Sequence, residues 1–225
     1  MDIIKLDFIT PGSIIQDKPI QPDKSGSMIT YHKAIAQSGR KISLDVSSTV
    51  CRNSPYLGIW EDNADTMRVE IDLNHQNSAT LVSMWKIQGT IEQYRKYINQ
   101  NLAANTTMRL RPDFDNLFAS NKATTTSIND EQRISVMSHW IGAAANLILG
   151  SDMSRIDDLG KQLLTSKKSR LATGFCGKWP MQPRNPGNGS STAQQRQGWV
   201  SGPSECGQGC EAASQLWSES GPRWI

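Results

Sequence analysis

The chain has 225 residues, a mass of 24.9 kDa and 24 basic against 21 acidic side chains, which gives a net charge of +3. This length fits one globular domain, because domains commonly hold about 100–200 residues. The small charge is spread along the chain without a basic block, which argues against a nucleic-acid partner. The apolar runs are far shorter than the roughly 18 residues that span a bilayer, so no membrane partner is predicted.

Metals, cofactors and export signals also leave no pattern in the sequence. Three histidines (His32, His75 and His139) and four cysteines lack the spacing of a metal site, so we expect neither a metal nor another cofactor. Residues 1–5 lead directly into a strand-like stretch and not into the roughly 7–15 apolar residues of a secretory signal. As written, the chain is expected to carry no signal peptide, and its oligomeric state stays open.

Strand-like and helix-like segments alternate over residues 1–169, which favours α/β units around a parallel sheet. Five segments have the apolar character and length of strands: residues 2–10, 41–47, 56–60, 107–111 and 146–150. Four others have helical periodicity or helix-capping residues: residues 28–38, 78–102, 129–144 and 154–168. After Ser169, glycine, proline and tryptophan accumulate, and neither a helical nor a strand period is expected.

Charged residues follow several of the predicted strands. Lys5 and Asp7 end the first strand, Arg68 and Asp72 follow the third, and Asp113 follows the fourth. In parallel α/β barrels the working side chains stand at the carboxyl ends of strands. Two carboxylates at this edge would make the acid/base and nucleophile pair of a glycosidase.

Each of these residues also has a structural interpretation. Asp7 would cap the turn that follows its strand, and Asp72 would be a solvated loop carboxylate. Lys5 and Arg68 would form structural ion pairs. Spacing alone leaves both interpretations open.

Four motifs in order strengthen the catalytic interpretation: Lys5-Leu6-Asp7, Arg68 with Asp72, residues 111–117 and residues 147–153. The series resembles glycoside hydrolase family 27, and in particular fungal α-galactosidases, over about residues 2–200. The resemblance implies an α/β fold that is part of a TIM (β/α)8 barrel, about strands four to eight. It also implies a retaining hydrolase that cleaves terminal α-D-galactosyl residues from oligosaccharides or polysaccharides.

The resemblance assigns roles to individual residues. The family's Lys-x-Asp pattern implies that Asp7 is the nucleophile and that Lys5 binds substrate. Its Trp-Arg-x-x-x-Asp pattern implies that Asp72 is the general acid/base and that Arg68 binds substrate, with Met67 in place of the usual Trp.

Two weaker substrate contacts, Ser47 and Asp113, are also implied by the resemblance. Ser47 lies where the family often has Cys-Glu-Trp, a motif that senses the substituent at carbon 2 of the sugar. The preference between galactose, N-acetylgalactosamine and arabinopyranose is therefore left open.

The chemistry sets requirements for these residues. Lys5 lies two residues before Asp7, hence on the same face of the strand, where its ammonium keeps Asp7 ionised. Asp72 has to stay protonated in the free enzyme, which calls for partial burial or a neighbouring carboxylate. Arg68 opposes that requirement.

The resemblance further implies three regions. Residues 1–169 are expected to form a partial catalytic barrel, residues 170–203 to begin the connection to a missing β-domain, and residues 204–225 to be a divergent irregular tail. The full-length family members are secreted. Because the family's first three strands, which bind the galactose hydroxyls, are expected to be missing, the alternative is an inactive truncated remnant with at most a weak carbohydrate-binding or interaction role. The open sheet edges also predict aggregation.

Overall fold

The computed structural model describes residues 3–7, 9, 14–15, 18–19, 25–47, 55–74, 81–104, 109–183 and 199–200. Its strands are β1 (Ile3–Leu6), β2 (Ile14–Ile15), β3 (Lys18–Pro19), β4 (Ser43–Val46), β5 (Thr66–Arg68), β6 (Arg111–Asp113), β7 (Gln182–Pro183) and β8 (Trp199–Val200). Its helices are α1 (Ser25–Ser38), α2 (Leu57–Asn63), α3 (Met84–Ala103), α4 (Ala123–Thr126), α5 (Asp130–Gly142), a 3-10 turn (Met153–Arg155), α6 (Asp158–Thr165) and α7 (Lys167–Lys178).

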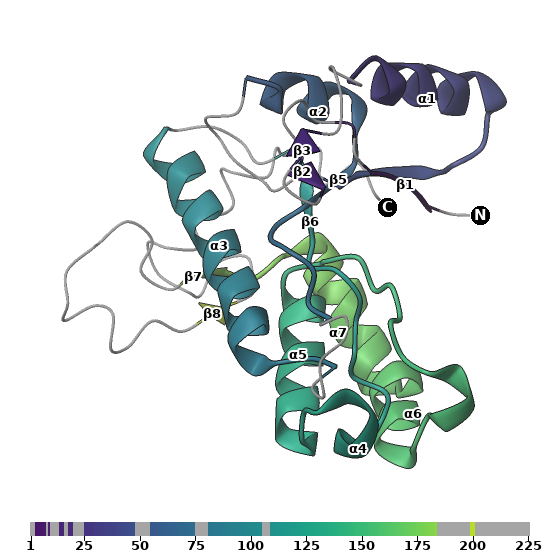
Figure 1. The fold of residues 1–225 in the computed structure, drawn as a ribbon, viewed down its shortest axis with the longest axis vertical. Helices are drawn as coiled ribbons and strands as arrows, with labels where there is room; N and C mark the ends of the chain where they lie inside the picture. Colours follow the sequence, from purple (N-terminus) through teal and green to yellow (C-terminus); the bar gives the residue numbers. More distant parts are fainter. Residues whose placement is uncertain are drawn as a thin grey trace.

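The central sheet has four parallel strands in the order β1-β4-β5-β6. Each strand of this sheet lies beside the sheet's next strand along the chain, and α1, α2 and α3 fall between successive pairs, as expected for βα units. Leu117 and Leu149 form a further parallel bridge, which is what the structure shows of the strand expected at residues 146–150. Helices α1 and α2 lie towards one end of the molecule, α5, α6 and α7 lie together at the other, and α3 runs along one side (Figure 1). The predicted α/β class is confirmed.

Two predicted helices have the ends that their residues specify. Helix α1 ends at Ser38 and is followed by Gly39 with φ of 67°, a left-handed conformation that glycine adopts without strain. Helix α5 begins with a capping box, in which Asn129 accepts from the Gln132 backbone N–H and the Gln132 side chain accepts from the Asn129 backbone N–H. Local side-chain chemistry therefore sets these boundaries.

The third and fourth predicted strands are misplaced. Residues 56–60 lie largely in helix α2, where Trp60 is fully buried and stacks on Tyr56 with ring centroids 6.0 Å apart. The strand is β5, whose three buried residues are too short a run to show alternation. Strand β6 begins at Arg111, where the predicted strand ends, and contains Pro112; residues 107–108 of the prediction lie outside the described residues. Pro112 is tolerated in this strand because it contributes a hydrogen-bond acceptor and no donor: its carbonyl accepts from the Asn146 backbone N–H.

The carboxy-terminal helical region also differs from the prediction. Residues 154–168 do not form one helix but three short ones, with Asp152, Asp157 and Ser166 each accepting a backbone N–H at a helix start. Helix α7 then continues to Lys178, so the expectation that helical structure ends at Ser169 is wrong. The division expected between residues 169 and 170 falls inside this helix.

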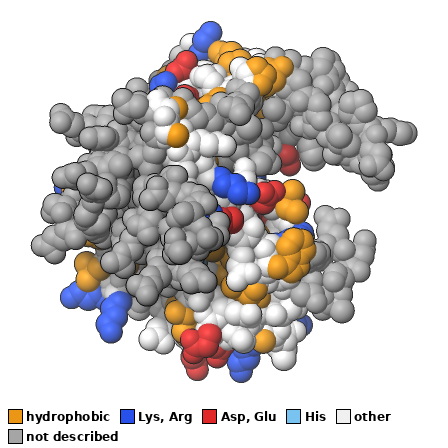
Figure 2. All heavy atoms as spheres, turned by 90° about the vertical axis from the view of Figure 1, so that its left-hand side faces the viewer, with side chains coloured by type: hydrophobic (Ala, Val, Ile, Leu, Met, Phe, Trp, Pro, Cys, Tyr) orange, Lys and Arg blue, Asp and Glu red, His pale blue; other side chains and the backbone are white. Residues whose placement is uncertain are grey.

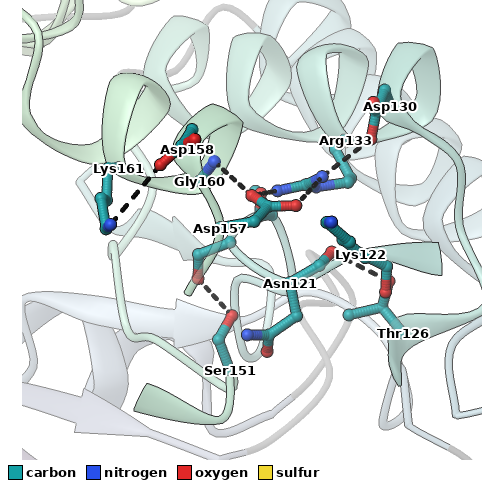
Figure 3. A network of polar contacts seen from close by, with 12 residues as sticks. Asn121, Lys122, Thr126, Asp130, Arg133, Ser151, Asp157, Asp158, Gly160 and Lys161 are labelled. Carbon is teal, nitrogen blue, oxygen red and sulfur yellow. Dashed lines mark hydrogen bonds and ion pairs between the residues drawn. The ribbon is translucent and has the colours of Figure 1, made fainter. Parts of the chain in front are cut away.

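A buried arginine joins α5 to α6 (Figure 3). Arg133 is fully buried and donates to Asp157 over 2.5 and 2.9 Å, to Asp130 over 2.7 Å and to the Ala119 carbonyl over 3.0 Å. Asp157 in turn accepts from the Gly160 backbone N–H. Because the planar guanidinium meets several fixed acceptors, it holds the two helices in one arrangement.

An aromatic cluster packs the segment after β6 against two helices. Phe114, which follows β6, meets Tyr94 of α3 and Trp140 of α5 edge-to-face, with centroids 5.3 and 5.1 Å apart. All three side chains are almost completely buried. This packing fixes α3 and α5 against the segment that follows β6.

The outer surface is mixed. Figure 2 shows basic and acidic side chains close together near the centre of one face, with hydrophobic groups scattered among them. Among the described residues, no helix combines the length and apolar character needed to cross a membrane.

Candidate active site

The parallel sheet brings the predicted charged residues to one edge. Because β1, β4, β5 and β6 run in the same direction, their carboxyl ends meet on one side. Asp7 directly follows β1, Ser47 follows β4, and Asp72 lies four residues beyond the end of β5. The Ser47 backbone N–H donates to the Leu6 carbonyl over 2.9 Å, which places Ser47 beside the residue that precedes Asp7.

Lys5 interacts with two carboxylates in the part of the site formed by β1, β4 and β6. Its ammonium donates to Asp113 Oδ2 over 2.6 Å and lies 3.7 Å from Asp45 Oδ2. The Lys5 side chain is 30% exposed, whereas both carboxylates are fully buried. One partly exposed cation therefore faces two carboxylates that water does not reach.

Asp45 is held from its other side by neutral groups. Its Oδ1 accepts from the Thr66 hydroxyl over 2.6 Å, and Thr66 accepts from the Asn146 amide over 3.0 Å. Burial, followed by the negative charge of Asp113, raises the pKa of Asp45 to about 7, although Thr66 and Lys5 act in the opposite direction.

Asp113 has the opposite balance. Burial disfavours its charge, but the Lys5 ammonium and its hydrogen bond outweigh burial and lower the pKa of Asp113 below its usual value. Its Oδ1 also accepts the Asp115 backbone N–H over 2.9 Å. Asp113 therefore ionises more readily than an ordinary aspartate, and its carboxylate anchors Lys5 deep in the sheet.

Arg68 interacts with two carboxylates in the other part of the site. Its guanidinium lies 2.6 Å from Asp72 Oδ1 and 3.1 Å from Asp115 Oδ2. Asp115 also accepts the Leu73 backbone N–H over 2.7 Å and has a left-handed φ of 71°, a conformation that aspartate tolerates better than most residues. These contacts fix the loop that carries Asp72 to the end of β6.

The two parts of the site form one polar network. It runs from Lys5 through Asp113 to the Asp115 backbone, and from the Asp115 carboxylate through Arg68 to Asp72. Asp72 is 71% exposed and Asp7 is exposed, so both candidate catalytic carboxylates are open to a ligand. The partial burial expected for Asp72 is not observed.

The sequence interpretation missed four members of this network: Asp45, Thr66, Asp115 and Asn146. Asp45 had a visible signal, because a carboxylate between Leu44 and Val46 in a buried strand needs a partner. The others depend on contacts between strands that lie far apart in the sequence. Asp113 was predicted as a substrate contact; its side chain is fully buried and is occupied with Lys5.

Other features of the described residues are not part of this site. They contain no group of three or more His, Cys, Asp and Glu side chains that would hold a metal ion. An apolar hollow of about 410 Å³ lies between α5, α6 and α7, with Leu117, Leu149 and Leu164 among its lining residues. It shares no residue with the charged network.

Two curated proteins with similar sequences are named as α-galactosidases. Over 211 residues the chain is 46% identical to a protein of Emericella nidulans named putative alpha-galactosidase 8, a match that covers 92% of this chain and 42% of that protein. It is also 46% identical over 206 residues to alpha-galactosidase 3 of Hypocrea jecorina, covering 91% of this chain and 33% of that protein. The chain thus spans less than half the length of these curated relatives. No family model matches it.

A solved structure has a similar fold. The chain matches a family 27 β-L-arabinopyranosidase from Geobacillus stearothermophilus with a TM-score of 0.55 and 18% identity, over 89% of this chain and 42% of that one. At this identity the likeness concerns the fold. The curated relatives confirm the predicted resemblance to α-galactosidases, and the fold likeness to a family 27 enzyme agrees with the interpretation of the sheet as part of a barrel.

Proposed function

We propose, from this resemblance to fungal α-galactosidases, that the chain carries the catalytic carboxylates of a retaining glycoside hydrolase that removes terminal α-D-galactosyl residues. The observation that best supports the proposal is the network that ties Lys5, two residues before Asp7, to the pair of Arg68 and Asp72. The network links the strand that Asp7 follows to the loop that carries Asp72, at one edge of the sheet.

In this proposal Asp7 is the nucleophile. Its carboxylate attacks the anomeric carbon and forms a covalent β-linked galactosyl ester as the glycosidic bond breaks. The Lys5 ammonium, which is partly exposed and lies two residues before Asp7 on β1, donates to sugar hydroxyls.

Asp72 is the general acid/base. It gives a proton to the leaving oxygen in the first step and takes one from water in the second, when the ester is hydrolysed. Arg68 holds the Asp72 carboxyl in position through the 2.6 Å contact. A bound sugar would also shield this exposed group from water, which strengthens its interactions.

A second candidate is a non-catalytic carbohydrate-binding role. It is favoured by the exposure of Asp72 and by its pairing with Arg68, since a general acid usually sits in a less polar environment. Both candidates take a galactoside oligosaccharide or polysaccharide as ligand. We also propose that the full-length protein is secreted, as is typical of the family. We expect neither a nucleic acid nor a membrane as its partner.

Rescue of activity by azide distinguishes the nucleophile from the general acid/base. The 225-residue chain and its variants Asp7→Ala and Asp72→Ala are incubated with 4-nitrophenyl α-D-galactoside in the presence and absence of azide. We expect Asp7→Ala to be inactive alone and to form β-galactosyl azide, because azide attacks from the face that Asp7 has vacated. We expect Asp72→Ala to form α-galactosyl azide from the covalent intermediate.

Asp62→Ala is the matched control, because Asp62 is an exposed carboxylate of α2 paired with Arg109. It should hydrolyse the substrate at the rate of the unaltered chain. Wild-type turnover that survives Asp7→Ala without azide would overturn the nucleophile assignment. Galactose binding by calorimetry without any turnover would favour the non-catalytic role.

A further inference from the structure

Two buried carboxylates share one cation in the candidate site. The Lys5 ammonium is 2.6 Å from Asp113 Oδ2 and 3.7 Å from Asp45 Oδ2, and neither carboxylate is exposed to water. Lys5 comes from β1, Asp45 from β4 and Asp113 from β6, so three strands contribute to the cluster. The proposed catalytic cycle makes no use of Asp45.

The hydrogen-bond inventory distinguishes the two carboxylates. Asp113 accepts from Lys5 through one oxygen and from the Asp115 backbone through the other. Asp45 accepts from Thr66 through Oδ1, but its buried Oδ2 has no hydrogen-bond donor. Two carboxylates offer only acceptors to each other, so a proton on Asp45 Oδ2 supplies the missing donor.

The charges lead to the same assignment. With both carboxylates ionised, two buried negative charges would face one ammonium, and an excess buried charge is costly. Arg68 is the other cation that acts on Asp113, and it is already paired with Asp72 and Asp115. No further charged side chain acts on Asp45 among the described groups that shift its ionisation.

We propose that Asp45 holds a proton in a buried carboxyl pair with Asp113, and that it is a positioning residue whose ionisation draws the Lys5 ammonium away from the sugar and into the sheet. The catalytic consequence rests on the proposed function. The proton on Asp45 and the position of Lys5 are properties of the chain itself and are tested without a substrate.

The direction of the pH effect follows from the pair. While Asp45 is neutral, Lys5 balances Asp113 and keeps its partial exposure. The pKa of Asp45 is raised to about 7 by burial and by Asp113, so higher pH adds a second negative charge beneath Lys5. The attraction into the sheet then increases, and the ammonium becomes less available beside Asp7.

Proton linkage to folding is the first test. Because Asp45 binds its proton more tightly in the folded chain, this group makes the chain less stable as pH rises from its ordinary value of 3.8 to about 7. Urea unfolding is measured across that range for the 225-residue chain, Asp45→Asn and the exposed control Asp62→Asn.

Relative to Asp45→Asn, the unaltered chain should lose up to about tenfold in its folding equilibrium constant per pH unit. Asp62→Asn should keep the pH dependence of the unaltered chain. Equal pH dependence in the unaltered chain and Asp45→Asn would overturn the proposal.

The position of Lys5 is the second test. Reductive methylation with ¹³C keeps the charge of lysine, and the Lys5 signal is assigned by its loss in Lys5→Arg. We expect this signal to shift with a midpoint near pH 7 in the chain and to stay constant over that range in Asp45→Asn. A Lys5 signal that is insensitive to Asp45 would rule out the positioning role.

Thr66→Val covers the case in which Asp45→Asn does not fold. The Thr66 hydroxyl bond lowers the pKa of Asp45, so its removal should move the Lys5 midpoint to higher pH. An unchanged or lower midpoint would contradict the proposal.

Hydrolysis of 4-nitrophenyl α-D-galactoside is the third readout. In an active chain, kcat/KM should fall with a midpoint near pH 7, and Asp45→Asn should lack that fall. If no turnover occurs but the folding and Lys5 measurements behave as expected, the proposed enzyme activity fails while the buried proton and its effect on Lys5 stand. An active Asp45→Asn variant with the same midpoint as the unaltered chain would overturn the catalytic consequence.

Discussion

The ammonium of Lys5 lies 2.6 Å from Asp113 Oδ2, although 108 residues separate the two in sequence. They also come from the two outer strands of the sheet, β1 and β6, with β4 and β5 between them. In a flat sheet these outer strands would be about 14 Å apart, because neighbouring strands are separated by roughly 4.8 Å. The direct contact between the two side chains therefore fits a sheet that curves towards the face they share, as in the wall of a barrel.

Removal of the Lys5 charge should destabilise the fold. In Lys5→Met the buried Asp113 loses its cation, and we expect a loss of about 2–4 kcal/mol in the free energy of unfolding at pH 7, since the partly solvated ammonium is worth less than a fully buried partner. Urea unfolding measures it.

The pH dependence of this loss has a definite sign. Lys5 lowers the pKa of Asp113, so the stabilisation is present above the ordinary value of 3.8 and is lost as pH falls through the lower folded value. Lys161→Met, which alters an exposed lysine 3.5 Å from Asp158, should cost less than about 0.5 kcal/mol. Similar losses in both variants would contradict the burial argument.

Arg133 is expected to be the most sensitive ion-pair residue of the helical half. Arg133→Met leaves Asp157 and the Ala119 carbonyl without their buried donor, and we expect a loss of about 2–4 kcal/mol. Thermal unfolding is the measurement. Arg155→Met removes an exposed arginine 3.3 Å from Asp152 and should change stability by less than about 0.5 kcal/mol.

A methyl group at Gly160 has no room. A Cβ there would lie 2.2 Å from the Ser120 carbonyl oxygen, so Gly160→Ala has to displace α6 from its backbone contact. We expect a destabilisation of about 1–3 kcal/mol in chemical denaturation. Gly89→Ala is the matched control in α3, where nothing lies within 4 Å, and it should stabilise by about 0.5–1 kcal/mol. A neutral Gly160→Ala would show that the helix moves without cost.

The capping box of α5 should contribute measurably. Asn129→Ala removes the acceptor for the Gln132 backbone N–H, and we expect a loss of about 1 kcal/mol. Urea unfolding checks this value against Ser138→Ala, an exposed residue of the same helix that bonds to the Ile134 carbonyl. That control should stay within about 0.5 kcal/mol of the unaltered chain, and a comparable effect of both changes would argue against the cap.

Periodicity and capping chemistry in the sequence determined the local elements of this protein. The capping box at Asn129 and the glycine after α1 are properties of a few consecutive residues, so they are visible without a structure. The Lys5-Leu6-Asp7 and Arg68–Asp72 motifs were visible for the same reason. Residues 56–60 misled because an aromatic, apolar run fits a buried helix as well as a strand.

Only the tertiary structure decided how these motifs meet. The residues that the sequence interpretation missed join the site through contacts between distant parts of the chain. Thr66 bonds to Asp45 across 21 residues and to Asn146 across 80, and Asp115 accepts a backbone N–H from a residue 42 positions away. Sheet curvature and strand order set those distances, and neither is encoded in the spacing of any one segment. The charge states of Asp45 and Asp113 likewise depend on burial and on one shared ammonium, which is why two aspartates of the same chemistry differ in their affinity for a proton.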